Sequence, residues 1–258
     1  MRLSLLASGS KGNSIFVETG ETRLLVDAGC SGREILDRLG RIGIDPTTLN
    51  AILVSHEHGD HIRGVGTLAR RLKIPVLISY PTHAESKGHF AKVSLLEFES
   101  GYSFAFRDIQ IDPFPITHDA CDPVGFVIES GEGRVGIATD LGHATRLVKE
   151  KLKQCRTLVI EANHDEEMLL NGPYPWHLKQ RIRSRHGHLS NSESVALLEE
   201  VIHEGLAALF LAHLSEVNNH PDKATEATSS FLQSQNSCNP RVIVGNQYIP
   251  SELFDLHC

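Results

Sequence analysis

The chain has 258 residues, with 25 Lys and Arg against 32 Asp and Glu, so its formal net charge is −7. Hydrophobic residues make up 40% and charged residues 22%, a balance that excludes disordered and fibrous proteins. The acidic balance also argues against a protein that coats nucleic acid by bulk electrostatics, although it leaves room for an enzyme that grips a short stretch.

The sequence predicts a cytoplasmic protein with no membrane segment. The longest apolar run, residues 206–212, is far shorter than the roughly 18 residues of a membrane span. Polar residues 8–11 interrupt the N-terminus too early for a signal peptide. The cysteines form no Cys-x-x-Cys pair, which favours reduced thiols. They are Cys30, Cys121, Cys155, Cys238 and Cys258.

Short β-type runs separated by Gly-rich turns dominate the start of the chain. A helix with Ser31 as its expected N-cap follows them, and a buried strand then runs directly into His56. Strands are expected at residues 3–7, 14–18, 23–26 and 51–55, and the helix at residues 31–42.

Helices and strands alternate through the rest of the chain. Helices are expected at residues 61–72, 144–154, 165–170, 178–185, 192–203 and 222–232. Strands are expected at residues 75–78, 101–114, 124–129, 134–138, 157–160, 206–212 and 241–244. This order predicts an α/β fold with β-sheets sandwiched between helices. Because no repeat or linker interrupts it, we expect a single domain over residues 1–258.

A motif with four potential metal ligands, His-x-His-x-Asp-His, follows the strand at 51–55. It consists of His56, His58, Asp60 and His61. Neutral imidazoles and a carboxylate suit Zn²⁺, Mn²⁺ or Fe²⁺. We therefore predict a two-metal site, with His56 and His58 serving one ion and Asp60 and His61 the other. The alternative is a polar loop in which Asp60 caps the next helix.

Two ions need further ligands, and three residues stand where a strand ends, as the motif does. They are His118, Asp140 and His213. Alone, each of these residues would more often be a core or capping residue. Their shared placement with the motif favours metal ligands.

This series resembles the metal-binding series of the metallo-β-lactamase superfamily, and the residues Leu-Leu-Val-Asp-Ala-Gly at 24–29 resemble its first motif. The resemblance implies an αββα sandwich of two mixed β-sheets flanked by helices. It also implies a role for each residue. The first metal would be held by His56, His58 and His118, and the second by Asp60, His61 and His213. Asp140 would bridge the two metals. Asp27 would support the site by hydrogen bonds.

Other motifs resemble a narrower branch, the YycJ/WalJ/VicX group, which is similar to ribonuclease Z and to phosphodiesterases. The motifs lie at residues 8–14, 117–126, 161–165, 174–175, 178–182 and 187–191. Members of this group are regarded as 5′-to-3′ exonucleases acting on DNA. The resemblance therefore implies nucleic acid, and DNA in particular, as the substrate.

His188 stands just before a predicted helix N-terminus, where an anion can bind. It resembles the ribonuclease Z histidine that helps to protonate the leaving oxygen, so we predict a general acid or phosphate ligand. The alternative is a loop histidine that braces the helix.

Lys179 and Arg181, with Arg183 and Arg185, form a basic cluster that either clamps phosphates or is a solvated helix face. Asn163 and His164 either face the cleft as substrate-binding residues or begin a helix.

The sequence thus predicts a dinuclear metal-dependent phosphodiesterase, a 5′-to-3′ exonuclease in which a metal-activated hydroxide attacks phosphorus. Asp60 and His188 are its predicted catalytic residues. One alternative is a thioesterase or other small-substrate hydrolase of the same superfamily, which needs no cluster of phosphate ligands. Another is a non-catalytic regulatory metal protein, which the intact ligand series argues against.

Overall fold

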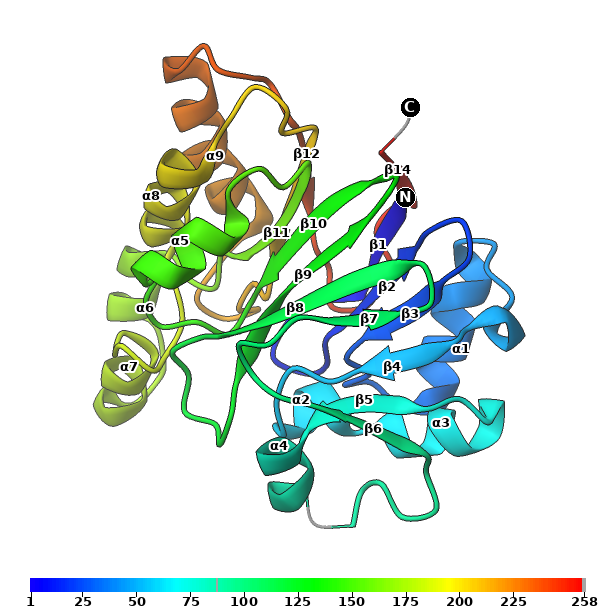
Figure 1. The fold of residues 1–258 in the computed structure, drawn as a ribbon. Coiled ribbons are helices and arrows are strands. Elements are labelled where there is room, and N and C mark those ends of the chain that lie inside the picture. Colours follow the sequence, from blue (N-terminus) through cyan, green and yellow to red (C-terminus); the bar gives the residue numbers. More distant parts are fainter. Residues whose placement is uncertain (87, 257–258) are drawn as a thin grey trace.

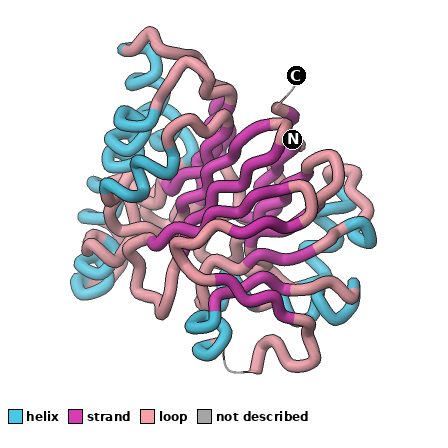
Figure 2. Tube along the Cα trace, viewed as in Figure 1, coloured by secondary structure: helices cyan, strands magenta, loops and turns pink. Residues whose placement is uncertain are grey.

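The computed structural model describes residues 1–86 and 88–256, so Cys258 lies outside the described residues. Two mixed β-sheets pack face to face, and helices cover both outer faces (Figures 1 and 2). Seven strands are described in each sheet. The predicted αββα sandwich is confirmed.

The first sheet has the strand order β14-β1-β2-β3-β4-β5-β6. These strands are β1 (Arg2–Ala7), β2 (Ser14–Glu18), β3 (Arg23–Val26), β4 (Ala51–Leu53), β5 (Val76–Ser79), β6 (Leu95–Phe98) and β14 (Phe254–Asp255). The helices of this half are α1 (Gly32–Arg41), α2 (Gly59–Ile62), α3 (Val65–Leu72) and α4 (Tyr80–Glu85), with a 3₁₀ turn at Pro46–Thr48. Ile35 of α1 and Leu68 of α3 share an apolar cluster with Leu25 and Ile52 of the sheet.

The second sheet has the order β13-β12-β11-β10-β9-β8-β7. These strands are β7 (Phe104–Phe106), β8 (Ile109–Pro115), β9 (Val124–Ser130), β10 (Gly133–Ala138), β11 (Thr157–Glu161), β12 (Ala208–Ala212) and β13 (Arg241–Val244). Its helices are α5 (Arg146–Leu152), α6 (Glu166–Asn171), α7 (Trp176–Ile182), α8 (Asn191–Val201) and α9 (Pro221–Ser234). Another apolar cluster, which includes Val26 and Phe210, lies between the two sheets.

Parallel pairing brings the functional strand ends to one edge of the sandwich. β3, β4 and β5 run parallel in the first sheet, and β10, β11 and β12 in the second. Asp27 and His213 directly follow β3 and β12, and Asp140 follows β10 after one intervening residue, with φ of 61°, 58° and 57° respectively. Non-glycine residues rarely adopt this left-handed conformation, and those that do concentrate at functional sites.

The observed elements differ from the expected ones where local contacts intervene. The helix expected over residues 61–72 is divided into α2 and α3, because the Gly64 amide donates to the Ala28 carbonyl at 2.8 Å. The strand expected over 101–114 is the hairpin β7–β8, which turns at Arg107 (φ 56°). The short elements α4 and β6 were not predicted. None of the described helices has the length and apolar character needed to cross a membrane.

Candidate metal centre

The loop from β4 into α2 carries the His-x-His-x-Asp-His motif and is fixed by backbone contacts on both sides. Asn13 N–H donates to the Asp60 carbonyl at 2.8 Å, and Ala28 N–H donates to the His61 carbonyl at 2.9 Å. Gly29 permits this close approach, because a Cβ there would lie 1.6 Å from the Asp60 carbonyl oxygen. The loop therefore has little freedom to move its side chains.

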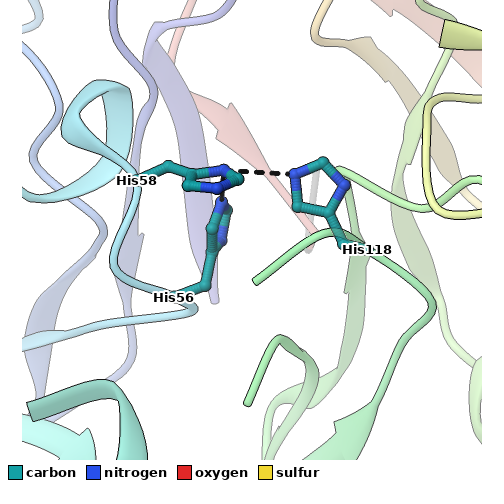
Figure 3. Close-up of side chains that lie close together, drawn as sticks. All are labelled: His56, His58 and His118. Atoms are coloured by element: carbon teal, nitrogen blue, oxygen red, sulfur yellow. Dashed lines mark hydrogen bonds between the residues drawn. The ribbon is translucent and has the colours of Figure 1, made fainter. Parts of the chain in front are cut away.

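Three imidazoles, His56, His58 and His118, converge across the two sheets (Figure 3). His58 Nδ1 lies 3.2 Å from His56 Nε2 and 3.3 Å from His118 Nε2. Burial, together with the neighbouring His61, holds the pKa of His56 well below its usual range, and burial also lowers the pKa of His118. Both histidines are therefore neutral at pH 7, which is the form that binds a metal ion.

A second group consists of Asp60, His61 and His213, whose potential ligand atoms all lie within 4.8 Å of one another. Asp60 Oδ2 is 3.7 Å from both His61 Nε2 and His213 Nε2. Burial disfavours the charge on His213, but the carboxylates of Asp140, Asp60 and Glu161 outweigh it and raise its pKa to about 10.

Asp140 lies between the two groups. Its Oδ2 is 3.2 Å from His61 Nε2, and its Oδ1 is 3.8 Å from His118 Nε2. Burial alone would raise its pKa, but the charges of His213 and His61 hold it well below the usual range. Asp140 Oδ2 and His213 Nε2 are buried without a hydrogen-bond partner among the described residues. Such atoms are costly to leave unpaired, and a divalent cation would satisfy both.

Asp27, the residue expected to support the site, forms hydrogen bonds with His61 and Ser55. Its Oδ2 accepts from His61 Nδ1 at 2.7 Å and from the Ser55 hydroxyl at 2.7 Å, and its Oδ1 accepts from Ser55 N–H at 2.8 Å. A proton held on His61 Nδ1 leaves Nε2 free to face the centre. Although burial opposes it, Asp140 and Asp27 raise the pKa of His61 well above its usual range.

Glu161, at the end of β11, lies within the motif at residues 161–165, but the sequence analysis gave it no role of its own. Its Oε1 lies 2.8 Å from both His188 Nδ1 and His213 Nδ1, and its Oε2 accepts from the amides of Leu141 and Leu189. The side chain is fully buried, yet His188 and His213 overcome the cost of burial and lower its pKa to about 2. An acidic residue ending a buried apolar strand was the available signal.

A cavity of about 230 Å³ opens beside this centre and contains several of the predicted substrate residues. Its lining includes His188, Asn163, Arg181, Ser10 and Tyr174. Asn163 also donates to the His213 carbonyl at 2.9 Å, and Arg181 donates to Asp119 at 2.7 Å across the rim. The His188 side chain is partly exposed to this space, at 22%.

Lys179 and His164 lie elsewhere. The Lys179 ammonium turns inward and donates to the carbonyls of Leu170 and Gly172 at 2.7 and 2.8 Å, where it caps the end of α6. These bonds use two of the three N–H donors of the ammonium, and Lys179 is absent from the lining of the cavity, so its phosphate contact stays a prediction. His164 is 1% exposed and is absent from the lining of the cavity.

Comparison with known proteins gives consistent matches. Residues 22–213 match the sequence family described as the beta-lactamase superfamily domain. The chain is 35% identical to the exodeoxyribonuclease YycJ of Bacillus anthracis over 238 residues, which cover 91% of this chain and 90% of that protein. It is 39% identical to the exodeoxyribonuclease WalJ of Streptococcus pneumoniae over 223 residues, 84% of this chain and 83% of WalJ.

Two solved structures share the fold along nearly the whole chain. The metallo-β-lactamase fold protein YhfI from Bacillus subtilis superposes with a TM-score of 0.73 at 17% identity, over 96% of this chain and 98% of YhfI. The short form of human tRNase Z superposes with a TM-score of 0.67 at 13% identity, over 97% and 98%. At these identities the likeness concerns the fold alone.

Proposed function

This chain belongs to the metallo-β-lactamase superfamily, in the branch of YycJ and WalJ, and from this premise we propose that it is a dinuclear phosphodiesterase that removes nucleotides from the 5′ end of DNA. The observation that carries the proposal is Asp140, a buried carboxylate that lies within 4 Å of imidazoles from both ligand groups. The names of the two relatives support DNA as the substrate.

The donor set suits two divalent ions of the Zn²⁺, Mn²⁺ or Fe²⁺ class. His56, His58 and His118 would hold the first ion and Asp60, His61 and His213 the second, with Asp140 shared. When bound, such a pair supplies Lewis acidity, lowering the pKa of water and polarising phosphoryl oxygens. The unpartnered Asp140 Oδ2 and His213 Nε2 are the buried atoms that support this assignment.

His188 is the proposed general acid for the leaving oxygen. Glu161 accepts from its Nδ1, so the imidazole is held in one orientation and Nε2 is left as the nitrogen that can hold a proton for the substrate. Because Glu161 also contacts His213, one buried carboxylate orients a proposed proton donor and a proposed metal ligand together.

The cavity beside His188 supports cleavage at a chain end. A volume of about 230 Å³ is small for a ligand site and better matches one nucleotide than a continuous duplex. Arg181 at its rim offers a guanidinium to a phosphate, and Tyr174 offers a ring for stacking on a base.

The test is digestion of labelled duplex DNA and single-stranded RNA by the metal-reconstituted protein. His58→Ala should be inactive, whereas His83→Ala, which removes an imidazole that is paired with Glu97 and belongs to neither ligand group, should retain wild-type activity. Stepwise loss of nucleotides from the 5′ end of DNA supports the proposal. Failure to cleave either polymer, combined with turnover of a thioester, would refute it.

A further inference from the structure

A second concave surface, which we call the α3 basic groove, lies on the flank of α2 and α3, outside the metal centre. It encloses about 540 Å³. Its lining consists of Arg63, Gly66, Thr67, Arg70, Gly88, His89, Ala91 and Lys92. The lining holds three cations and no carboxylate, in a chain whose acidic residues outnumber its basic ones.

The two arginines of the α3 basic groove are held by backbone carbonyls. Arg63 donates to the Lys11 carbonyl at 3.2 Å, and Arg70 donates to the Ala91 carbonyl at 2.9 Å. Within residues 1–86 and 88–256, neither arginine nor Lys92 forms an ion pair with a carboxylate. The Glu34 carboxylate acts on Arg63 through space, since Arg63 helps to lower the pKa of Glu34, but none of the three cations is held in an ion pair among the described residues. Their charge is therefore available to a phosphate.

The groove starts next to the metal centre. Arg63 follows His61 by two positions, and its carbonyl partner Lys11 adjoins Ser10, which lines the cavity beside His188. Arg63 follows the last residue of α2 and Arg70 lies on α3, and both side chains line the groove. The first sheet and α3 extend from α2, away from the metal centre (Figure 1).

We propose that the α3 basic groove binds the phosphate backbone of the substrate strand where the strand leaves the metal centre. This inference rests on the proposed nuclease function and adds a second contact region to it. The groove contributes affinity for long substrates and takes no part in bond cleavage.

The test uses the full chain with Arg70→Gln and Lys92→Gln combined, assayed on 30-nucleotide DNA and on the p-nitrophenyl ester of thymidine monophosphate. On DNA, kcat/KM should fall and the slope of its logarithm against log salt should become shallower by about 1.4 to 1.8, for two lost phosphate contacts. The small ester should be hydrolysed at the wild-type rate. Arg33→Gln with Arg71→Gln, two exposed cations outside the groove, is the matched control and should change neither substrate's kinetics.

Arg70→Lys separates charge from structure, because lysine keeps the cation but not the arginine's contact with Ala91. Recovery of DNA cleavage and of the salt slope by Arg70→Lys supports the proposal. An unchanged salt slope in the double variant would overturn it, as would equal losses on DNA and on the ester. If the wild-type protein cleaves neither substrate, it is the nuclease function itself that fails.

Discussion

The metal centre and helix α7 are both rich in ionisable side chains, yet only the first brings them to one point. His56, His118 and His213 come from three separate strand ends. His56 and His118 meet in one ligand group, His213 belongs to the other, and Asp140 lies between the two groups. On α7, the Lys179 ammonium turns toward the carbonyls of α6 while Arg181 reaches Asp119. A strand end fixes the position and direction of the next residue, whereas a helix spreads consecutive side chains around its axis. Sequence spacing is therefore more informative at strand ends than along a short helix.

The largest effect on DNA cleavage should come from removing the carboxylate that the two ligand groups share. Asp140→Ala removes the carboxylate between the two ligand groups, so DNA cleavage should fall by about 10³-fold or more. The measurement is kcat/KM on DNA together with the metal content of the purified variant. If the Asp140→Ala variant had the metal content and the turnover of the wild type, the proposal that both ions share Asp140 would be contradicted.

His188→Ala should lower DNA cleavage by about 10²-fold or more, because a positioned proton donor contributes that much. The loss should shrink on a p-nitrophenyl phosphodiester, whose leaving group departs without a proton. Glu161→Gln should give a milder defect of about 10-fold or more with the same dependence on the leaving group. Equal losses on both substrates would indicate that His188 is structural.

Metal binding should weaken as the pH falls. In the metal-free protein, carboxylates raise the pKa of His213 to about 10, so the histidine holds a proton at neutral pH that an ion must displace. Below that pKa, each pH unit should therefore lower the apparent affinity by about tenfold for each proton released. Calorimetry in buffers of different ionisation enthalpy measures those protons. Binding without proton release would contradict this electrostatic picture.

Arg181→Gln should raise KM for DNA by only about two- to fivefold, because the guanidinium is exposed and already paired with Asp119. The value of kcat should not change. A much larger loss would mean that the phosphate contact is stronger than its exposure suggests.

The smallest effect on catalysis should come from Lys179→Met, with kcat/KM unchanged. Its two contacts with the α6 carbonyls should instead appear as a loss of about 1–3 kcal/mol in the free energy of unfolding. Lys153→Met, which removes an exposed lysine paired only with Glu150, is the control and should leave stability nearly unchanged. Chemical denaturation measures both. Reduced DNA binding with normal stability in Lys179→Met would indicate that Lys179 contacts the substrate.

The order of the elements predicted sheets between helices, and the resemblance implied the αββα sandwich. The nearness of the candidate ligands was predictable because each of them stands near the end of a strand. The helix cap at Ser31 was equally predictable, since Ser31 forms a capping box with Glu34, and Ser190 forms the same kind of capping box with Glu193. Glu161 was missed because its role depends on two histidines that lie 27 and 52 positions away. The direction of the Lys179 side chain could not be predicted because it is set by the end of another helix. Long-range contacts of this kind leave no local pattern.

The most direct test of the account is anomalous diffraction from crystals of the metal-reconstituted protein, recorded at the absorption edge of the metal. Two peaks are predicted, one among His56, His58 and His118 and the other among Asp60, His61 and His213, with the Asp140 carboxylate between them. A single peak, or two peaks without Asp140 in contact, would contradict a shared two-metal centre.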